Sequence, residues 1–181
     1  SNKLLTPFGP GREPMLRRAF AATDTPLLAS RVVVARSPEV ETLCREVSVP
    51  CLLHALPGRN DTVRLGLEYL LPRFPAMSGC VFLPGDQPLL RRESVAGEID
   101  FFAKNANSIV AMGHGARRGN PVIFPREFFR ELRTLEGERG GGAVMAAHRE
   151  RIMLYQLENE AELTDIDTAS DYIMLQKENG R

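Results

Sequence analysis

The sequence places an acidic residue where open α/β sheets bind their ligands, in the turn after a buried strand. Asp86 stands in the motif P-G-D-Q-P at residues 84–88, directly after the apolar run at residues 80–83. A carboxylate there can hold Mg²⁺, a hard cation that prefers oxygen and usually keeps phosphates and water as its other ligands. Asp86 could instead simply begin a turn, because aspartate is common in that role. The motif alone leaves both interpretations open.

A second acidic motif, T-D-I-D-T at residues 164–168, lies near the end of the sequence. Asp165 and Asp167 point to the same side of an extended segment, because alternate residues share a face. The pair could complete a metal site with Asp86. Asp167 or Thr168 could instead cap the helix that is predicted to follow, since both residue types are favoured at that position.

The motif R-R-G-N-P at residues 117–121 combines basic groups with an amide between two predicted strands. The two guanidinium groups of Arg117 and Arg118 and the amide of Asn120 can together bind an anion or the edge of a base, and Gly119 makes the backbone flexible there. An exposed basic hairpin tip would have the same composition. The sequence therefore predicts either an anion site or a solvated turn here.

Two glycine-containing motifs lie where predicted helices begin. P-G-R-N-D-T at residues 57–62 ends a strand, and its Gly58, Asn60 and Thr62 stand at a helix N-terminus, where N–H groups favour anions and bases. A glycine cluster at residues 137–142 precedes an alanine-rich helix, so its backbone could bind a phosphate. The cluster is equally typical of a flexible turn.

Apolar periodicity and turn residues predict strands and helices that alternate along the sequence. Strands are expected at residues 31–35, 51–55, 80–83, 108–112, 121–124 and 152–157. Helices are expected at residues 14–20, 37–47, 62–74, 92–104, 125–135 and 170–177. This alternation is typical of one three-layer α/β/α domain with a mainly parallel, Rossmann-like sheet, spanning residues 1–181. The motifs above then lie in loops at the edges of that sheet.

The composition narrows the class of protein. Of the 181 residues, 43% are hydrophobic and 25% charged, which favours a globular domain over a disordered chain. Lys and Arg number 23 and so do Asp and Glu, so no net basic charge is available for nucleic acid or an anionic membrane surface. No apolar run reaches the length of a membrane span. The three cysteines lack metal or redox spacing and are expected to be buried, reduced thiols of a cytoplasmic protein.

Taken in order, these motifs resemble the MobA-like nucleotidyltransferases, especially their molybdenum cofactor cytidylyltransferase branch. The resemblance covers almost the entire chain and rests on N-K-L-L at residues 2–5, G-R-N-D-T-V-R-L-G-L at 58–67, G-D-Q-P at 85–88, R-G-N-P-V-I-F at 118–124 and D-I-D-T at 165–168. It implies the nucleotide-diphospho-sugar transferase type of fold. It also implies transfer of a nucleoside monophosphate to molybdopterin, with CTP favoured over GTP as donor.

The resemblance also assigns roles to residues. Lys3 and Asp86 are implied as catalytic, with Mg²⁺ bound by Asp86 together with Asp165 or Asp167. The implied substrate contacts come from three loops, with Gly58, Asn60 and Thr62 near the base and Gln87, Pro88, Arg118, Gly119 and Asn120 as the others. A molybdenum hydroxylase apoenzyme or its chaperone is the implied protein partner.

The sequence departs from the family pattern at its beginning. The family has a strand and a glycine-rich L-x-A-G-x-S-x-R-x-G loop just before the lysine that matches Lys3, and the sequence starts without them. Milder departures are Thr62 in place of serine and Ala169-Ser170 in place of Pro-Glu. Two other functions remain open: a nucleotidyltransferase for another acceptor, such as a sugar phosphate, and a non-catalytic module that binds a nucleotide or cofactor.

Overall fold

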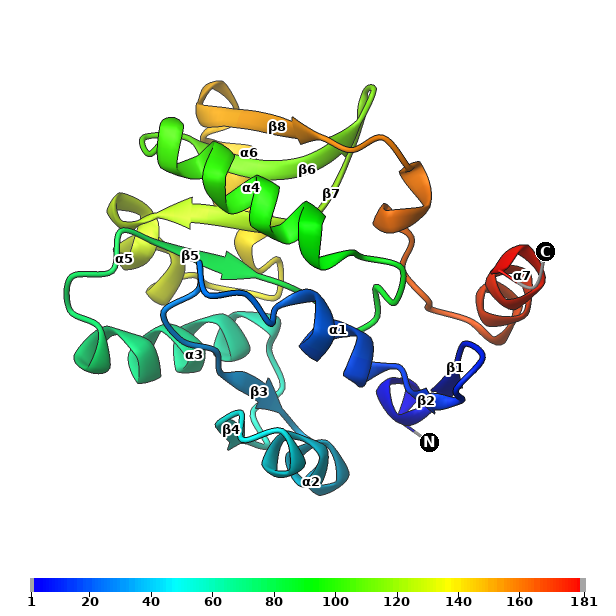
Figure 1. The fold of residues 1–181 in the computed structure, drawn as a ribbon. Helices are drawn as coiled ribbons and strands as arrows, with labels where there is room; N and C mark the ends of the chain where they lie inside the picture. The colour runs from blue at the N-terminus through cyan, green and yellow to red at the C-terminus, as the bar shows by residue number, and fades with distance from the viewer. Residues whose placement is uncertain (1, 180–181) are drawn as a thin grey trace.

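The computed structural model describes residues 2–179, and helices and strands alternate along most of this span (Figure 1). Its central sheet has the strand order β5-β7-β6-β8, made by β5 (Gly79–Phe82), β7 (Arg117–Pro125), β6 (Ile109–His114) and β8 (Ile152–Gln156). β6 and β8 pair in parallel, whereas β7 pairs antiparallel with both β5 and β6. Strands β5, β6 and β8 therefore run in one direction, and their carboxyl ends meet at one edge.

β7 runs against its neighbours because a short hairpin connects it to β6. The two strands pair at His114 and Arg117, which leaves only a two-residue connection between them. A parallel neighbour would require a crossover of a dozen or more residues. The predicted α/β class is confirmed, and the opposite direction of β7 is a detail that the sequence pattern did not predict.

A second, two-stranded parallel sheet is made by β3 (Val33–Ala35) and β4 (Cys51–Leu53). The crossover between them is helix α2 (Pro38–Glu46). This helix begins where the sequence predicts it, because Ser37 stands at the N-cap position and Pro38 has the fixed φ that suits a first turn.

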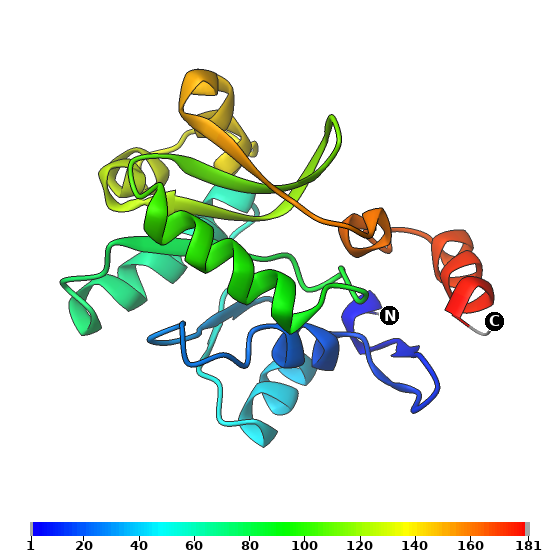
Figure 2. The same cartoon turned by 45° about the horizontal axis from the view of Figure 1, so that its top comes forward.

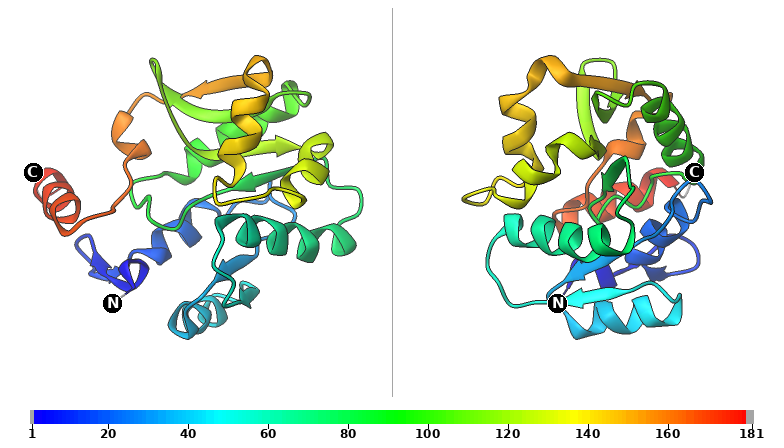
Figure 3. Two further views of the ribbon diagram at one scale, coloured as in Figure 1. Left: turned by 180° about the vertical axis from the view of Figure 1, so that it is seen from behind. Right: turned by 90° about the vertical axis from the view of Figure 1, so that its left-hand side faces the viewer.

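Helices cover both faces of the central sheet. Figure 1 shows α4 (Arg92–Lys104) in front of it, and α1 (Leu16–Ala22) contacts α4. Seen from behind in Figure 3, the other face carries α3 (Arg59–Arg73), α5 (Phe129–Arg133) and α6 (Gly141–Ala147). These elements form the three layers expected from the sequence.

The apolar strands supply the core to both helical layers. On β6, Ile109 and Ala111 pack toward α5 and α6, and Val110 and Met112 pack toward α4, as strand alternation requires. All four side chains are fully buried. A strand buried on both faces reads as the continuous apolar run seen in the sequence.

The two ends of the described chain pack together at one end of the molecule (Figures 1 and 2). A 3₁₀ helix, η1 (Lys3–Leu5), leads into a hairpin of β1 (Pro7–Phe8) and β2 (Glu13–Pro14), and α7 (Ala169–Asn179) lies against that hairpin. The rings of Phe8 and Tyr172 meet edge to face with centroids 5.9 Å apart. This packing brings Lys3 close to the acidic motif before α7.

A cavity of about 670 Å³ separates the two sheets. Within the part of the chain that the structure describes, β3 pairs only with β4 and β5 pairs only with β7, so each keeps one unpaired edge. The cavity is lined by residues of both strands, by α1, α3 and α4, and by Asn2 and Leu4. It is predominantly apolar, since its strand walls are residues 32–35 and 79–83.

No helix among residues 2–179 has the length and apolar character that crossing a bilayer requires. The three cysteines are free thiols, with Cys44 and Cys80 buried and Cys51 half-buried. Burial raises the pKa of Cys44 and of Cys80 to about 12 and raises the pKa of Cys51 as well.

These pKa shifts predict slow labelling of the thiols in the folded protein. With a pKa of about 12, about one thiol in ten thousand is ionised at about pH 8, and the thiolate is the reactive form. We expect a disulfide reagent to modify Cys44 and Cys80 only after denaturant is added, with Cys51 reacting first in the native protein. Rapid native labelling of Cys44 or Cys80 would contradict their burial.

Candidate functional site

Two carboxylates converge on one ammonium group at the carboxyl edge of the central sheet. Lys3 Nζ lies 2.6 Å from Asp86 Oδ2 and 2.9 Å from Asp167 Oδ1. The side chain of Asp86 is 15% exposed, and that of Asp167 is 69% exposed. Burial acts to lower the pKa of Lys3, but its hydrogen bonds to the two carboxylates raise that pKa above the usual value. The catalytic pair implied by the resemblance is therefore in direct contact.

Asp165 lies in the electrostatic field of the same group. Burial raises the pKa of Asp165, and the negative charges of Asp86 and Asp167 raise it further. Three carboxylates therefore gather around Lys3, with Asp86 and Asp167 bonded to its ammonium group.

Local backbone contacts explain why Asp167 is available for this role. Thr168 and Asp171 form a reciprocal cap at the start of α7: Asp171 N–H donates to Thr168 Oγ1 (3.1 Å), and Thr168 N–H donates to Asp171 Oδ2 (2.9 Å). Asp167 is thus not the capping side chain. The N–H of Ile166 donates to the carbonyl of Asp86 at 2.9 Å, which ties the two acidic motifs together.

The donor set fits a hard divalent cation. Asp86 Oδ1 is buried and has no hydrogen-bond partner within the described chain, and Asp86 Oδ2 and Asp167 Oδ1 already share a cation, the Lys3 ammonium. Residues 2–179 hold no group of three or more His, Cys, Asp or Glu side chains placed to bind a metal. A cation here would need further ligands, and Mg²⁺ usually takes them from phosphates and water.

Gln87 and Pro88 are buried behind Asp86. Gln87 Nε2 donates to the carbonyl of Asn120 at 2.7 Å and to the carbonyl of Glu162 at 2.8 Å. Its donor atoms therefore bind backbone, and a contact of Gln87 with substrate stays a prediction. Gln87 instead joins the D-Q-P motif to the R-G-N-P motif and to the 3₁₀ helix η4 (Glu160–Leu163).

The R-G-N-P motif opens strand β7 rather than forming only a loop. Arg117, the first arginine of the R-R-G-N-P motif, pairs with Glu160 at 3.2 Å and donates to the carbonyl of Leu163 at 3.3 Å. Arg118 is exposed at the start of the strand, so it is the arginine available to an anion. A Cβ on Gly119 would lie 3.2 Å from Leu163 Cδ2, which explains the small residue there.

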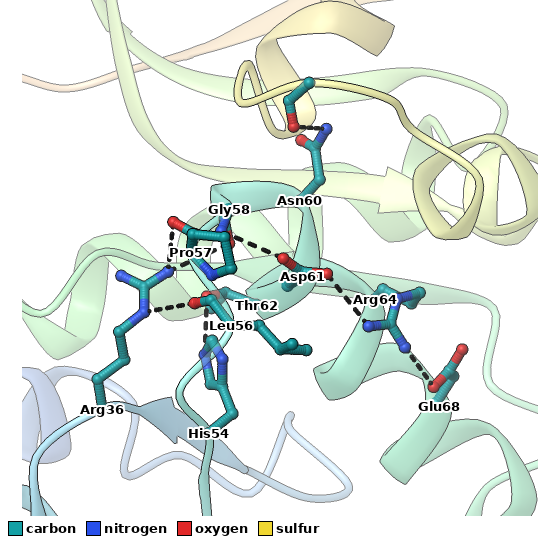
Figure 4. A network of polar contacts seen from close by, with 11 residues as sticks. Arg36, His54, Leu56, Pro57, Gly58, Asn60, Asp61, Thr62, Arg64 and Glu68 are labelled. Carbon is teal, nitrogen blue, oxygen red and sulfur yellow. Dashed lines mark hydrogen bonds and ion pairs between the residues drawn. The ribbon is translucent and has the colours of Figure 1, made fainter.

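The loop at residues 57–62 forms a separate polar network at the start of α3 (Figure 4). Gly58 N–H donates to Asp61 Oδ2 (3.1 Å), and Thr62 Oγ1 lies 3.3 Å from His54 Nε2. Arg36, which the sequence analysis missed, donates to the carbonyls of residues 56, 57 and 58. It stands directly after β3, so the rule that ligands bind beyond strand carboxyl ends could have singled it out.

Asn60 is buried and faces the glycine cluster rather than solvent. Its Nδ2 donates to the carbonyl of Gly137, and its Oδ1 accepts the N–H of Gly140 at 2.7 Å. Gly140 has φ of 58°, a conformation that favours glycine. The cluster therefore makes a turn held by Asn60, and contact of Asn60 with a nucleotide stays a prediction.

A polar pocket of about 510 Å³ lies beside these two loops. Its lining residues are Arg36, Pro57, Arg59, Thr62 and Glu138. The positive end of the α3 dipole and two guanidinium groups lie beside one carboxylate, so the pocket offers both donors and acceptors to a polar ligand.

Comparison with known proteins shows the family of the chain. The MobA-like NTP transferase domain matches residues 1–152. The 3-deoxy-manno-octulosonate cytidylyltransferase of Polynucleobacter necessarius subsp. necessarius (strain STIR1) is 32% identical over 80 residues, which are 44% of this chain and 32% of that protein. The matched region thus spans about a third of that relative's length.

Solved structures share the fold. Rv0371c from Mycobacterium tuberculosis H37Rv superposes with a TM-score of 0.83 at 20% identity, covering 98% of this chain and 90% of that one. The same protein in complex with manganese gives 0.79 at 19% identity over 97% and 91%. CMP:2-keto-3-deoxy-manno-octonic acid synthetase complexed with CTP gives 0.74 at 11% identity over 98% and 91%. With its family domain matched over residues 1–152, the chain belongs to the family of MobA-like NTP transferase domains.

Proposed function

We propose that this protein is a nucleotidyltransferase that moves a nucleoside monophosphate from CTP, in preference to GTP, to the terminal phosphate of molybdopterin. The observation that carries the proposal is the convergence of Asp86 and Asp167 on the ammonium group of Lys3 at the carboxyl edge of the sheet. Membership of the MobA-like family and the similarity to cytidylyltransferases support the reaction and the choice of CTP.

In the proposed reaction, a phosphate oxygen of the acceptor attacks the α-phosphorus of the nucleotide. The bond between the α-phosphorus and the bridging oxygen breaks, and pyrophosphate leaves. No protein nucleophile is needed, because positioning and charge neutralisation do most of the work in such transfers. Lys3 neutralises phosphate oxygens, and Asp86 and Asp167 are the residues that would hold Mg²⁺, with Asp165 adding negative charge beside them. Bound Mg²⁺ would supply charge neutralisation of the triphosphate.

The proposed substrate positions follow the two polar regions of the site. The base lies in the pocket lined by Arg36, Arg59 and Thr62, whose donors and acceptors suit a base edge. The acceptor lies toward Arg118 and Asn120. We place the reaction in the cytoplasm, where three free thiols stay reduced, with a molybdenum hydroxylase apoenzyme or its chaperone as the recipient of the product.

We further propose that a strand and a glycine-rich loop encoded before Ser1 complete this site. The cavity between β3 and β5 supports the proposal, because both flanking strands keep an unpaired edge there and Asn2 and Leu4 line the same cavity. A strand in that place would pair with both edges and join the two sheets. Its loop would reach the carboxyl edge beside Lys3 and offer N–H groups to the triphosphate.

The proposed loop predicts a difference in nucleotide affinity. We expect the protein beginning at Ser1 to bind CTP with Mg²⁺ at least about tenfold more weakly than the full-length protein, since it lacks several oriented donors worth about 1 kcal/mol each. Calorimetric titration of CTP into both proteins measures this. Equal affinities would mean that residues within the 181-residue chain hold the triphosphate.

Release of pyrophosphate from the full-length protein tests the proposed reaction. We expect release with CTP, Mg²⁺ and molybdopterin, and much slower release when GTP, ATP or UTP replaces CTP. A cytidylyltransferase acting on a sugar acid is the second candidate, favoured by the 32% identical relative. Faster release with 3-deoxy-manno-octulosonate than with molybdopterin would establish it. Tight nucleotide binding without release under any of these conditions would indicate a non-catalytic module.

A further inference from the structure

Two buried polar side chains, Gln87 and Glu162, connect the segments that carry the acidic residues of the site. They are 3% and 4% exposed. The Gln87 amide donates to the carbonyls of Asn120 and Glu162, which lie 33 and 75 residues away in the sequence. One side chain therefore joins three segments at the carboxyl edge of the sheet: the D-Q-P loop, the start of β7 and the 3₁₀ helix η4.

Glu162 extends this connection to helix α4. Its Oε1 accepts the N–H of Arg91, the N-cap residue of α4, at 2.9 Å. The hydrogen bond from Ile166 N–H to the carbonyl of Asp86 joins the two acidic segments directly. Hydrogen bonds thus hold the backbone of both segments, the one that carries Asp86 and the one that leads to Asp167.

The two ion pairs that Lys3 makes with Asp86 and Asp167 cannot hold these carboxylates in place in the same way. Lys3 is 44% exposed on its side chain and Asp167 is 69% exposed, and exposed ion pairs contribute little to holding a geometry. Hydrogen bonds made by buried amide and carboxylate groups cost more free energy to break, because breaking one leaves a partner unsatisfied in the interior. The contacts of Gln87 and Glu162 are of this second kind.

We propose that Gln87 and Glu162 are positioning residues that set the separation between Asp86 and Asp167. They act through backbone, and neither needs to touch the cation. This inference rests on the proposed function only in taking the two carboxylates as a cation site.

The first measurement is the affinity of the 181-residue chain for Mn²⁺, followed by electron paramagnetic resonance. We expect Gln87→Leu and Glu162→Leu each to weaken binding about tenfold, as loss of supporting hydrogen bonds around metal ligands commonly does. Glu162→Gln keeps an oxygen to accept the Arg91 N–H and should restore binding to within about twofold of the wild type. The matched control is Asn105→Ala, which removes a hydrogen bond from a side-chain amide to the carbonyl of Phe101 at the other end of α4.

The second measurement is amide hydrogen exchange at Ile166, which reports the contact between the two acidic segments without any metal. In Gln87→Leu it should accelerate at least about tenfold relative to the amides of β6, which report global stability. Unchanged Mn²⁺ affinity and unchanged Ile166 exchange in Gln87→Leu would overturn the inference. If the wild type binds no Mn²⁺, the proposed cation site fails and Ile166 exchange alone decides. If Gln87→Leu does not fold, the Glu162→Gln and Glu162→Leu pair decides by the same two readouts.

Discussion

Replacing Asp86 with asparagine should abolish nucleotide transfer while the fold stays intact. The asparagine keeps the shape and one oxygen of the side chain. It removes the negative charge that, together with that of Asp167, faces the ammonium group of Lys3. We expect the rate of pyrophosphate release by the full-length protein with CTP, Mg²⁺ and acceptor to fall at least about a thousandfold, because charge stabilisation of this kind is worth several kcal/mol. The melting temperature should change little.

Asp100→Asn is the matched control, since Asp100 is an exposed acid on α4 and loses the same charge. It should retain wild-type activity. Nearly full activity of Asp86→Asn would remove Asp86 from the proposed site, and an equal loss in Asp100→Asn would attribute the effect to net charge.

Replacing Phe124 with alanine should cause a large loss of stability, larger than the loss caused by replacing Phe101. Phe124 is 1% exposed on β7, and its ring packs edge to face against Phe82 with centroids 5.6 Å apart. It also fills the space beneath α6, where a Cβ on Gly141 would lie only 3.0 Å from it. We expect Phe124→Ala to lower the free energy of unfolding by about 3–5 kcal/mol, measured by urea denaturation.

Phe101→Ala provides the comparison for that measurement. Phe101 is half-buried and packs on Tyr155 with centroids 5.8 Å apart, so its truncation leaves a smaller cavity. We expect a loss roughly half as large, in proportion to the apolar area removed. A Phe124→Ala variant no less stable than Phe101→Ala would mean that α6 does not pack on β7 as described.

The sequence pattern predicted the strands well where apolar runs end at turn residues. The run at residues 80–83 corresponds to β5, and the run at 108–112 to β6. β7 was predicted to begin at residue 121 but begins at Arg117, because its first residues are polar and their pairing with β6 is a long-range contact that no local pattern reveals. The hairpin of β1 and β2 and the helix η1 were not predicted either.

The sequence indicates where the acidic residues lie, but it does not indicate which residues support them. The position of Asp86 after a strand follows from local sequence, as does the adjacency of Asp165 and Asp167. The contact of Asp167 with Lys3 could not be predicted, because it depends on Asp171, whose reciprocal cap with Thr168 leaves Asp167 free to face Lys3. The inward orientation of Gln87 depends on carbonyls 33 and 75 residues away, so periodicity and motif spacing contain no signal for it.

The most direct test of the proposed function follows the α-phosphate itself. The full-length protein is incubated with CTP labelled at the α-phosphorus, Mg²⁺ and molybdopterin, and the products are separated and identified. The proposed reaction predicts that the label moves to the pterin in a new phosphate–phosphate linkage, with one pyrophosphate released for each label transferred. Label that stays in CTP, or that appears only as free CMP, would contradict it.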